Sequence, residues 1–202
     1  MKVWKVALGL VIALFVISAV VWWIRPKEED QFVLPERVCG DVFLGKKIQP
    51  LLQGVKSEVE VENIRDFPGS RENTSSPVCE MRAKGRSVAF RVDHPSYPEK
   101  QVDIEKENRF VVQLGSAYGV YAESSGTMIL EIPCPTKKES DVALFLNVGA
   151  SMAREGEKGG RAKLADLTGY AARTLAQNVY KCKGADKLPE GPVHIKKGEG
   201  TR

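Results

Sequence analysis

The chain has 202 residues, of which 43% are hydrophobic and 28% charged, with 30 lysines and arginines against 26 acidic residues. Such a near-balanced mixture gives no electrostatic footprint for nucleic acid, which requires a clustered basic face, so we expect no nucleic-acid partner. Once the terminal segments described below are set aside, about 150 residues remain, which is enough for one domain with a single core.

Residues 6–24 are 19 consecutive uncharged residues, and twelve of them are Leu, Ile, Val or Phe. A helix of this length is roughly 28 Å long, close to the thickness of the hydrocarbon core of a bilayer. Trp4 precedes the segment and Trp22 and Trp23 lie at its far end, where indole rings favour the headgroup layer. We interpret residues 6–24 as a transmembrane signal anchor and residues 1–5 as a cytoplasmic stub.

Two processing alternatives are less favoured. A secretory leader has an apolar stretch of 7–15 residues before a small-residue cleavage site, but apolar residues continue for five positions beyond Ile17-Ser18-Ala19. A lipoprotein needs a cysteine to carry the lipid, and the first cysteine, Cys39, lies well past the apolar run. Lysines before the segment and basic residues after it favour a cytoplasmic N-terminus only slightly.

Four cysteines follow the apolar segment, and none belongs to a C-x-x-C pair. They are Cys39, Cys79, Cys134 and Cys182. An even number of widely spaced cysteines is typical of structural disulfides in an oxidising compartment, although reduced core cysteines in a cytosolic domain are the alternative. We therefore predict an extracellular domain on a single-pass anchor in the cell membrane.

In chain order, residues 25–35 are charged and bracketed by prolines, which indicates a stalk. The domain then covers residues 36–184. Its first segment has apolar residues at helical spacing, interrupted by Gly45 and Pro50, and predicts two short helical pieces that end at Gly54.

Alternation in "SEVEVENI" predicts a strand with Glu58, Glu60 and Glu62 on one face. This row could bind calcium or a basic partner, but a solvated edge strand is the favoured interpretation. A loop over residues 66–77 follows and contains an N-glycosylation sequon at Asn73.

"VCEMRA", Lys84-Gly85 and "RSVAFRV" predict a hairpin in which Val88, Phe90 and Val92 point inward. "DHPSYPEK" predicts a proline loop, and a charged stretch of ambiguous structure follows it. "RFVVQLG", "AYGVYAE", "TMILEIPC" and "DVALFLNV" predict further strands.

The last predicted element is a long helix in "AKLADLTGYAARTLAQNVYKCKG", stopped by Gly184. Residues 185–202 are rich in Pro, Gly and charge and are expected to be disordered. The element order predicts an α+β fold, an antiparallel sheet with the long C-terminal helix and a short N-terminal helix packed on one face, preceded by a single transmembrane helix. Of the three disulfide pairings possible, Cys134–Cys182 would fix helix to sheet and Cys39–Cys79 would tie the first helix to the hairpin.

Catalytic motifs are almost absent from the sequence. Gly149-Ala150-Ser151-Met152-Ala153 nearly matches the nucleophile elbow G-x-S-x-G, which requires a strand, a sharp turn and a helix. The only histidines are His94, in the expected proline loop, and His194, in the expected disordered tail. An ordinary strand-to-loop turn is the favoured interpretation of Ser151. There is no P-loop, dinucleotide fingerprint or clustered His/Cys site, so we expect no catalytic residue, cofactor or metal.

The layout resembles small, uncharacterised membrane-anchored or lipoprotein-like surface proteins of actinobacteria. The resemblance spans residues 34–193 and rests on "LPERVCGDVFLGKKIQPLL", "VCEMR", "LEIPCP" and "KCKGADKLPEGPV". It implies a Gram-positive cell surface and no particular activity, and the missing lipid-bearing cysteine separates this chain from the lipoprotein members.

These observations predict a tethered domain that binds or scaffolds at the cell envelope without catalysis. The alternatives are an envelope hydrolase whose active site forms only in three dimensions, and an accessory subunit of a membrane complex. Small residues in the anchor (Gly9, Ala13 and Ala19) would permit the close helix approach that a membrane complex needs.

Overall fold

The computed structural model describes residues 33–52, 60–63, 78–83, 85–137, 139–154, 156 and 159–201. Phe32–Arg202 form one compact unit. The expected stub, the expected anchor at residues 6–24 and most of the expected stalk lie outside the described residues. Within the described part of the chain, no helix combines the length and the apolar character that a membrane crossing requires.

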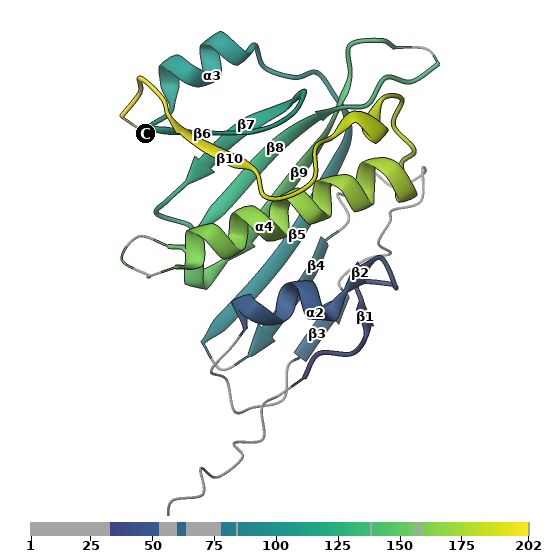
Figure 1. Cartoon of the computed structure of the whole chain (residues 1–202), viewed down its shortest axis with the longest axis vertical. Helices are drawn as coiled ribbons and strands as arrows, with labels where there is room; N and C mark the ends of the chain where they lie inside the picture. Colours follow the sequence, from purple (N-terminus) through teal and green to yellow (C-terminus); the bar gives the residue numbers. More distant parts are fainter. Residues whose placement is uncertain are drawn as a thin grey trace, which may run out of the picture. The chain divides into compact units, whose positions relative to one another are not determined.

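A single antiparallel sheet of eight strands dominates the unit (Figure 1), with the order β10-β6-β7-β8-β9-β5-β4-β3. The strands are β3 Glu60–Asn63, β4 Val78–Ala83, β5 Arg86–Ser96, β6 Phe110–Leu114, β7 Ala117–Ala122, β8 Thr127–Pro133, β9 Ala143–Ala150 and β10 His194–Lys197. The strands predicted between residues 78 and 150 are thus confirmed, and together with helices they make the fold α+β.

Period-two alternation explains why these segments become strands. In β5, Val88, Phe90 and Val92 are fully buried while Arg91 is exposed, as the alternation predicts. Gly85 has a φ of +83°, a left-handed conformation that suits the tight hairpin turn between β4 and β5.

The strand β5 is longer than predicted, because it continues through His94 and Pro95 to Ser96. The expected proline loop is therefore wrong for these residues. The register between β5 and β9 shifts between Asp93 and Ser96, and such an irregularity accommodates a proline that cannot donate to the ladder.

The segment before β3 differs from the two helical pieces that we expected. Its first half is a small hairpin of β1 (Arg37–Val38) and β2 (Phe43–Leu44), and only its second half is helical, with α2 (Gly45–Ile48) and the 3-10 turn η1 (Gln49–Leu51). The hairpin turn has positive φ angles at Cys39, Gly40 and Asp41, which an α-helix cannot accommodate.

The long C-terminal helix is confirmed as α4 (Gly160–Arg173), continued by the π-helix η3 (Thr174–Val179). Its buried face carries the residues spaced by three or four, namely Leu164, Leu167, Ala171 and Leu175. The helix ends before the predicted Gly184, because Lys181 adopts a φ of +53° and the Cys182 N–H donates to the Ala176 carbonyl at 2.7 Å. A residue with a left-handed conformation just after the last turn is typical of a helix C-terminus.

The expectation of a disordered tail at residues 185–202 is wrong. The tail forms the 3-10 turn η4 (Ala185–Lys187), runs alongside α4 and ends as β10, which pairs with β6 (Figure 1). The Val193 N–H donates to the Ala165 carbonyl of α4 at 3.2 Å. Gly169 permits this close approach, because a Cβ there would lie 2.4 Å from the Gly191 carbonyl oxygen.

Helices cover both faces of the sheet. On one face, α4 contacts β8, β9 and α2, and the main core lies between these helices and the sheet. On the other face, the helix α3 (Gln101–Glu107), which the sequence left ambiguous, packs Ile104 against Val111 and Tyr118. The predicted packing of the long and the short helix on one face agrees with these contacts, and α3 adds a second, smaller layer.

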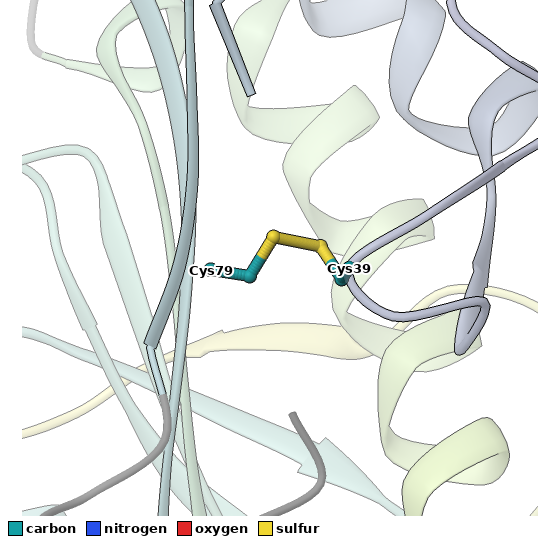
Figure 2. Close-up of a disulfide and its surroundings, with 2 residues drawn as sticks. All are labelled: Cys39 and Cys79. Carbon is teal, nitrogen blue, oxygen red and sulfur yellow. A yellow bond between two sulfur atoms is a disulfide. The ribbon is translucent and has the colours of Figure 1, made fainter. Parts of the chain in front are cut away.

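Both predicted disulfides are present. Cys39 bonds to Cys79 with the Cα atoms 5.6 Å apart, and Cys134 bonds to Cys182 with the Cα atoms 4.6 Å apart. Figure 2 shows the first of them joining the β1–β2 turn to β4. The second joins the segment after β8 to the end of the long helix, so each bond ties one peripheral segment to the sheet.

Candidate functional site

The segment at Ser151 that nearly matches the nucleophile elbow has a structural role. Ser151 lies in the 3-10 turn η2 (Ser151–Ala153), and α4 begins only at Gly160, so the strand does not turn directly into a helix as a nucleophile elbow requires. The Ser151 hydroxyl oxygen accepts a hydrogen bond from the Ser87 N–H at 2.9 Å. This contact joins η2 to β5.

The two histidines do not combine with Ser151. His194 lies on β10, and three strands separate β10 from β9, which leads into Ser151. Four inter-strand steps amount to about 19 Å, far beyond hydrogen-bond distance. His94 lies on β5 rather than in a loop, and its side chain is outside the described residues.

The residues of the predicted acidic row and of the glycosylation sequon lie at one edge of the sheet or outside the described part of the chain. Glu60 and Glu62 belong to β3, which is an edge strand as expected, whereas Glu58 and Asn73 are outside the described residues. Among the described residues, no three His, Cys, Asp or Glu side chains are grouped to hold a metal ion. The four cysteines form the two disulfides described above.

A hollow of about 400 Å³ lies between α2, α4 and the tail, and we name it the α2–α4 groove. It is lined by Lys46, Lys47, Pro50, Lys163, Asp166, Leu167, Tyr170, Arg173, Glu190 and Gly191. Four of these side chains are cationic and two are anionic. The groove is therefore a basic hollow within a domain whose charges are otherwise nearly balanced.

Tyr170 is the aromatic residue that lines the groove. Its hydroxyl oxygen accepts a hydrogen bond from the Leu44 N–H at 2.8 Å, and its ring lies 6.1 Å from that of Phe43 in the core. The Lys47 Nζ lies 5.7 Å from the centroid of the Tyr170 ring, within the range of a cation–π interaction. These contacts fix the ring and place a lysine over it.

The cations of the groove differ in how many hydrogen bonds and ion pairs they already make within the domain. Arg173 donates to the carbonyls of Pro189 and Gly191 at 2.8 and 2.9 Å, and it lies 3.5 Å from Glu190. The Lys163 Nζ donates to the Pro50 carbonyl at 3.2 Å.

Lys46 and Lys47 are exposed, and neither makes an ion pair with a residue in the described part of the chain. The two α2 lysines are therefore the cations best placed to meet a ligand.

A second hollow, of about 440 Å³, borders β6 and β7 and contains Arg109, Phe110, Tyr121 and Glu123. Arg161, at the start of α4, lies over the rings of Phe110 and Tyr121 at 4.8 and 5.0 Å and pairs with Glu123. Arg109 also approaches Glu123, at 3.7 Å. Both guanidinium groups thus interact with one carboxylate, and this cluster joins the start of α4 to the sheet.

A third group of titratable residues lies on the face covered by α3. Glu131 is 9% exposed, and burial raises its pKa to about 7 even though its carboxylate accepts the Glu99 N–H at 3.0 Å. The Tyr118 hydroxyl donates to Glu105 at 2.5 Å, which lowers the pKa of Glu105, while burial and this bond raise the pKa of Tyr118 to about 12. Glu131 belongs to neither of the two hollows described above.

Sequence reasoning did not single out the α2–α4 groove. Its one local signal is the pair Lys46-Lys47, which occupies the exposed side of α2 while Ile48 is buried. The other cations come from residues more than a hundred positions later, so their approach to α2 depends on the packing of two helices.

Comparisons of the chain with protein-family models, with curated proteins and with solved structures found no match.

Proposed function

We propose that this chain is a single-pass membrane protein whose domain lies outside the cell, where it binds or scaffolds a component of the envelope without catalysing a reaction. The observation that carries the proposal is that all four cysteines are paired in two disulfides. Structural disulfides persist in oxidising compartments and are rare in the cytosol. The resemblance noted in the sequence supports a Gram-positive cell surface as the setting.

The proposed anchor rests on the apolar segment at residues 6–24, which is long enough to cross the hydrocarbon core. An oxidised domain that follows such a segment requires the N-terminus in the cytoplasm and the domain on the opposite side. The disulfides thus support an orientation that the charges flanking the segment favour only slightly.

Binding rather than catalysis is supported by how the fold uses its candidate nucleophile. The Ser151 hydroxyl is engaged by the Ser87 N–H, and His194 lies at the far edge of the sheet. The α2–α4 groove instead presents exposed cations around a fixed aromatic ring, an arrangement suited to holding a ligand. We propose this groove as the binding surface.

The topology and redox state can be tested on the full chain in membranes of a Gram-positive host. We expect the protein to remain in the pellet after an alkaline carbonate wash and to be cut by protease added to intact protoplasts. A thiol-reactive polyethylene glycol should add to its four cysteines only after denaturation and reduction. Release by carbonate, or four reactive thiols in the denatured but unreduced chain, would overturn the proposal.

A further inference from the structure

We propose that the α2–α4 groove docks on anionic phospholipid headgroups of the same membrane that anchors the chain. This inference rests on the proposed function, because it requires the anchor. It names the ligand of the groove as the phosphate groups at the bilayer surface. Two features of the groove support it: its position along the chain and the kind of charges it presents.

The groove adjoins the point where the chain enters the domain. The Leu34 N–H donates to the Gln49 side chain at 2.8 Å, and the Gly45 N–H donates to the Glu36 carbonyl at 2.9 Å. The first described residues are therefore bonded to α2 and η1, the elements that carry Lys46, Lys47 and Pro50 of the groove.

The connection to the proposed anchor is short. Residues 25–33 can span at most about 30 Å even when fully extended. Such a tether keeps the α2 lysines at a high effective concentration relative to the bilayer surface, so that weak individual contacts suffice for docking.

The charges of the groove suit a surface of many phosphates better than one small anion. Lysines act as point charges and lack the fork with which arginine binds a single phosphate through two hydrogen bonds. Arg173 is already engaged by two carbonyls and Glu190, and Asp166 lies in the same hollow. A free phosphate would thus find no dedicated pair of donors here.

The geometry of the cations also favours an extended charged surface. Lys163 and Arg173 are ten residues apart on one helix, which places their Cα atoms about 15 Å apart along its axis. Lys46 and Lys47 face them from α2. Lysine stems and a tyrosine ring are side chains that combine an apolar body with a polar end, and such side chains are favoured at the interface of a bilayer.

The inference can be tested on the full chain reconstituted in two sets of nanodiscs. One set contains phosphatidylcholine alone, and the other contains phosphatidylglycerol in addition. The readout is the rate at which an amine-reactive reagent modifies each lysine, measured by mass spectrometry. We expect Lys46, Lys47 and Lys163 to react at least about threefold more slowly in the anionic discs at low salt, and this protection to be lost at high salt.

Matched variants test whether the protection of the lysines depends on the charges of the groove. Lys46→Gln combined with Lys47→Gln should abolish the protection of Lys163. Lys100→Gln combined with Lys106→Gln removes the same charge from the α3 side of the sheet and should leave it unchanged. Asp166→Asn should increase the protection, because it removes a negative charge from the groove. If the groove residues had only a structural role, the labelling rates would not depend on lipid charge.

Three outcomes would overturn the inference. Equal labelling in the two sets of discs would refute lipid docking while leaving the anchor intact. Protection by soluble inorganic phosphate or polyphosphate in neutral discs, without protection by the anionic lipid, would assign the groove to a free anion. Failure of the chain to enter the discs would refute the anchor itself and, with it, the inference.

Discussion

The two faces of the sheet are held in different ways. The face under α4 and α2 has a large apolar core, and both disulfides tie peripheral segments to it. The face under α3 has a cluster of Ile104, Val111 and Tyr118, bordered by the titratable Glu131. The first face therefore depends on apolar burial and covalent links, whereas the second depends on a few contacts whose strength varies with pH.

Because of this difference, global stability and the response to pH depend on different faces of the sheet. A residue buried deep in a close-packed core cannot be changed without a large cost in free energy. A carboxyl group on the face opposite that core can gain or lose a proton without disturbing it. We therefore expect perturbations of the α4 face to reduce global stability and changes of pH to act mainly through the α3 face.

Removal of both disulfides together should have the largest effect. Each bond closes a long loop, with sequence separations of 40 and 48 residues, and loops of this length correspond to about 4 kcal/mol each in the chain-entropy treatment. Cys134→Ser combined with Cys182→Ser should lower the free energy of unfolding by about this amount, as measured by urea denaturation. A loss below about 0.5 kcal/mol would show that the bond contributes nothing to the α4 face.

Truncation of one apolar side chain on each face compares the two layers directly. Phe90 is fully buried and its ring stacks on Phe43 at a centroid distance of 4.4 Å, so Phe90→Ala should cost about 4 kcal/mol. Ile104→Ala should cost about 2 kcal/mol, because a short helix over a small cluster can relax into the cavity. Equal losses in thermal or urea denaturation would contradict the proposed asymmetry.

The pH dependence of stability should come in part from Glu131. Its pKa is raised from 4.5 to about 7 in the folded state, so the folded state holds this proton more tightly than the unfolded chain does. The resulting contribution is fully present below pH 4.5, declines as the pH rises toward 7 and is absent above it. It amounts to roughly 3 kcal/mol.

Glu131→Gln removes this titration and supplies the control. The difference in unfolding free energy between the native chain and the variant should change across that interval of pH and stay constant above it. Urea denaturation at a series of pH values measures this difference. If the two profiles run parallel throughout, Glu131 has an ordinary pKa and the α3 face is no more sensitive to pH than the α4 face.

The sequence predicted the strands and the long helix well because their patterns are strong. Alternation along β5 and the three-to-four spacing along α4 each place apolar side chains on one face, and burial of that face is what stabilises both elements. The disulfide pairing followed from the same reasoning, since Cys134 and Cys182 each end an element that must pack against the other.

The predictions from the sequence were wrong where tertiary contacts outweigh local composition. The segment at residues 188–193 is rich in proline and glycine, yet Leu188 and Val193 are buried and Gly169 lets the segment reach the α4 backbone. The β1–β2 hairpin replaces a predicted helix because Cys39 must reach Cys79 through a turn. In α3, only Ile104 is buried, so the sequence shows no apolar stripe there.

The sequence by itself determined the class of fold, the order of the strands along the chain and the cysteines available for pairing, because these depend on periodicity and spacing. Only the tertiary structure decided that the tail completes the sheet, that a third helix covers its second face, and that α2 and α4 bring their cations together around Tyr170. Those features depend on contacts between residues far apart in the chain, and no local pattern encodes such contacts.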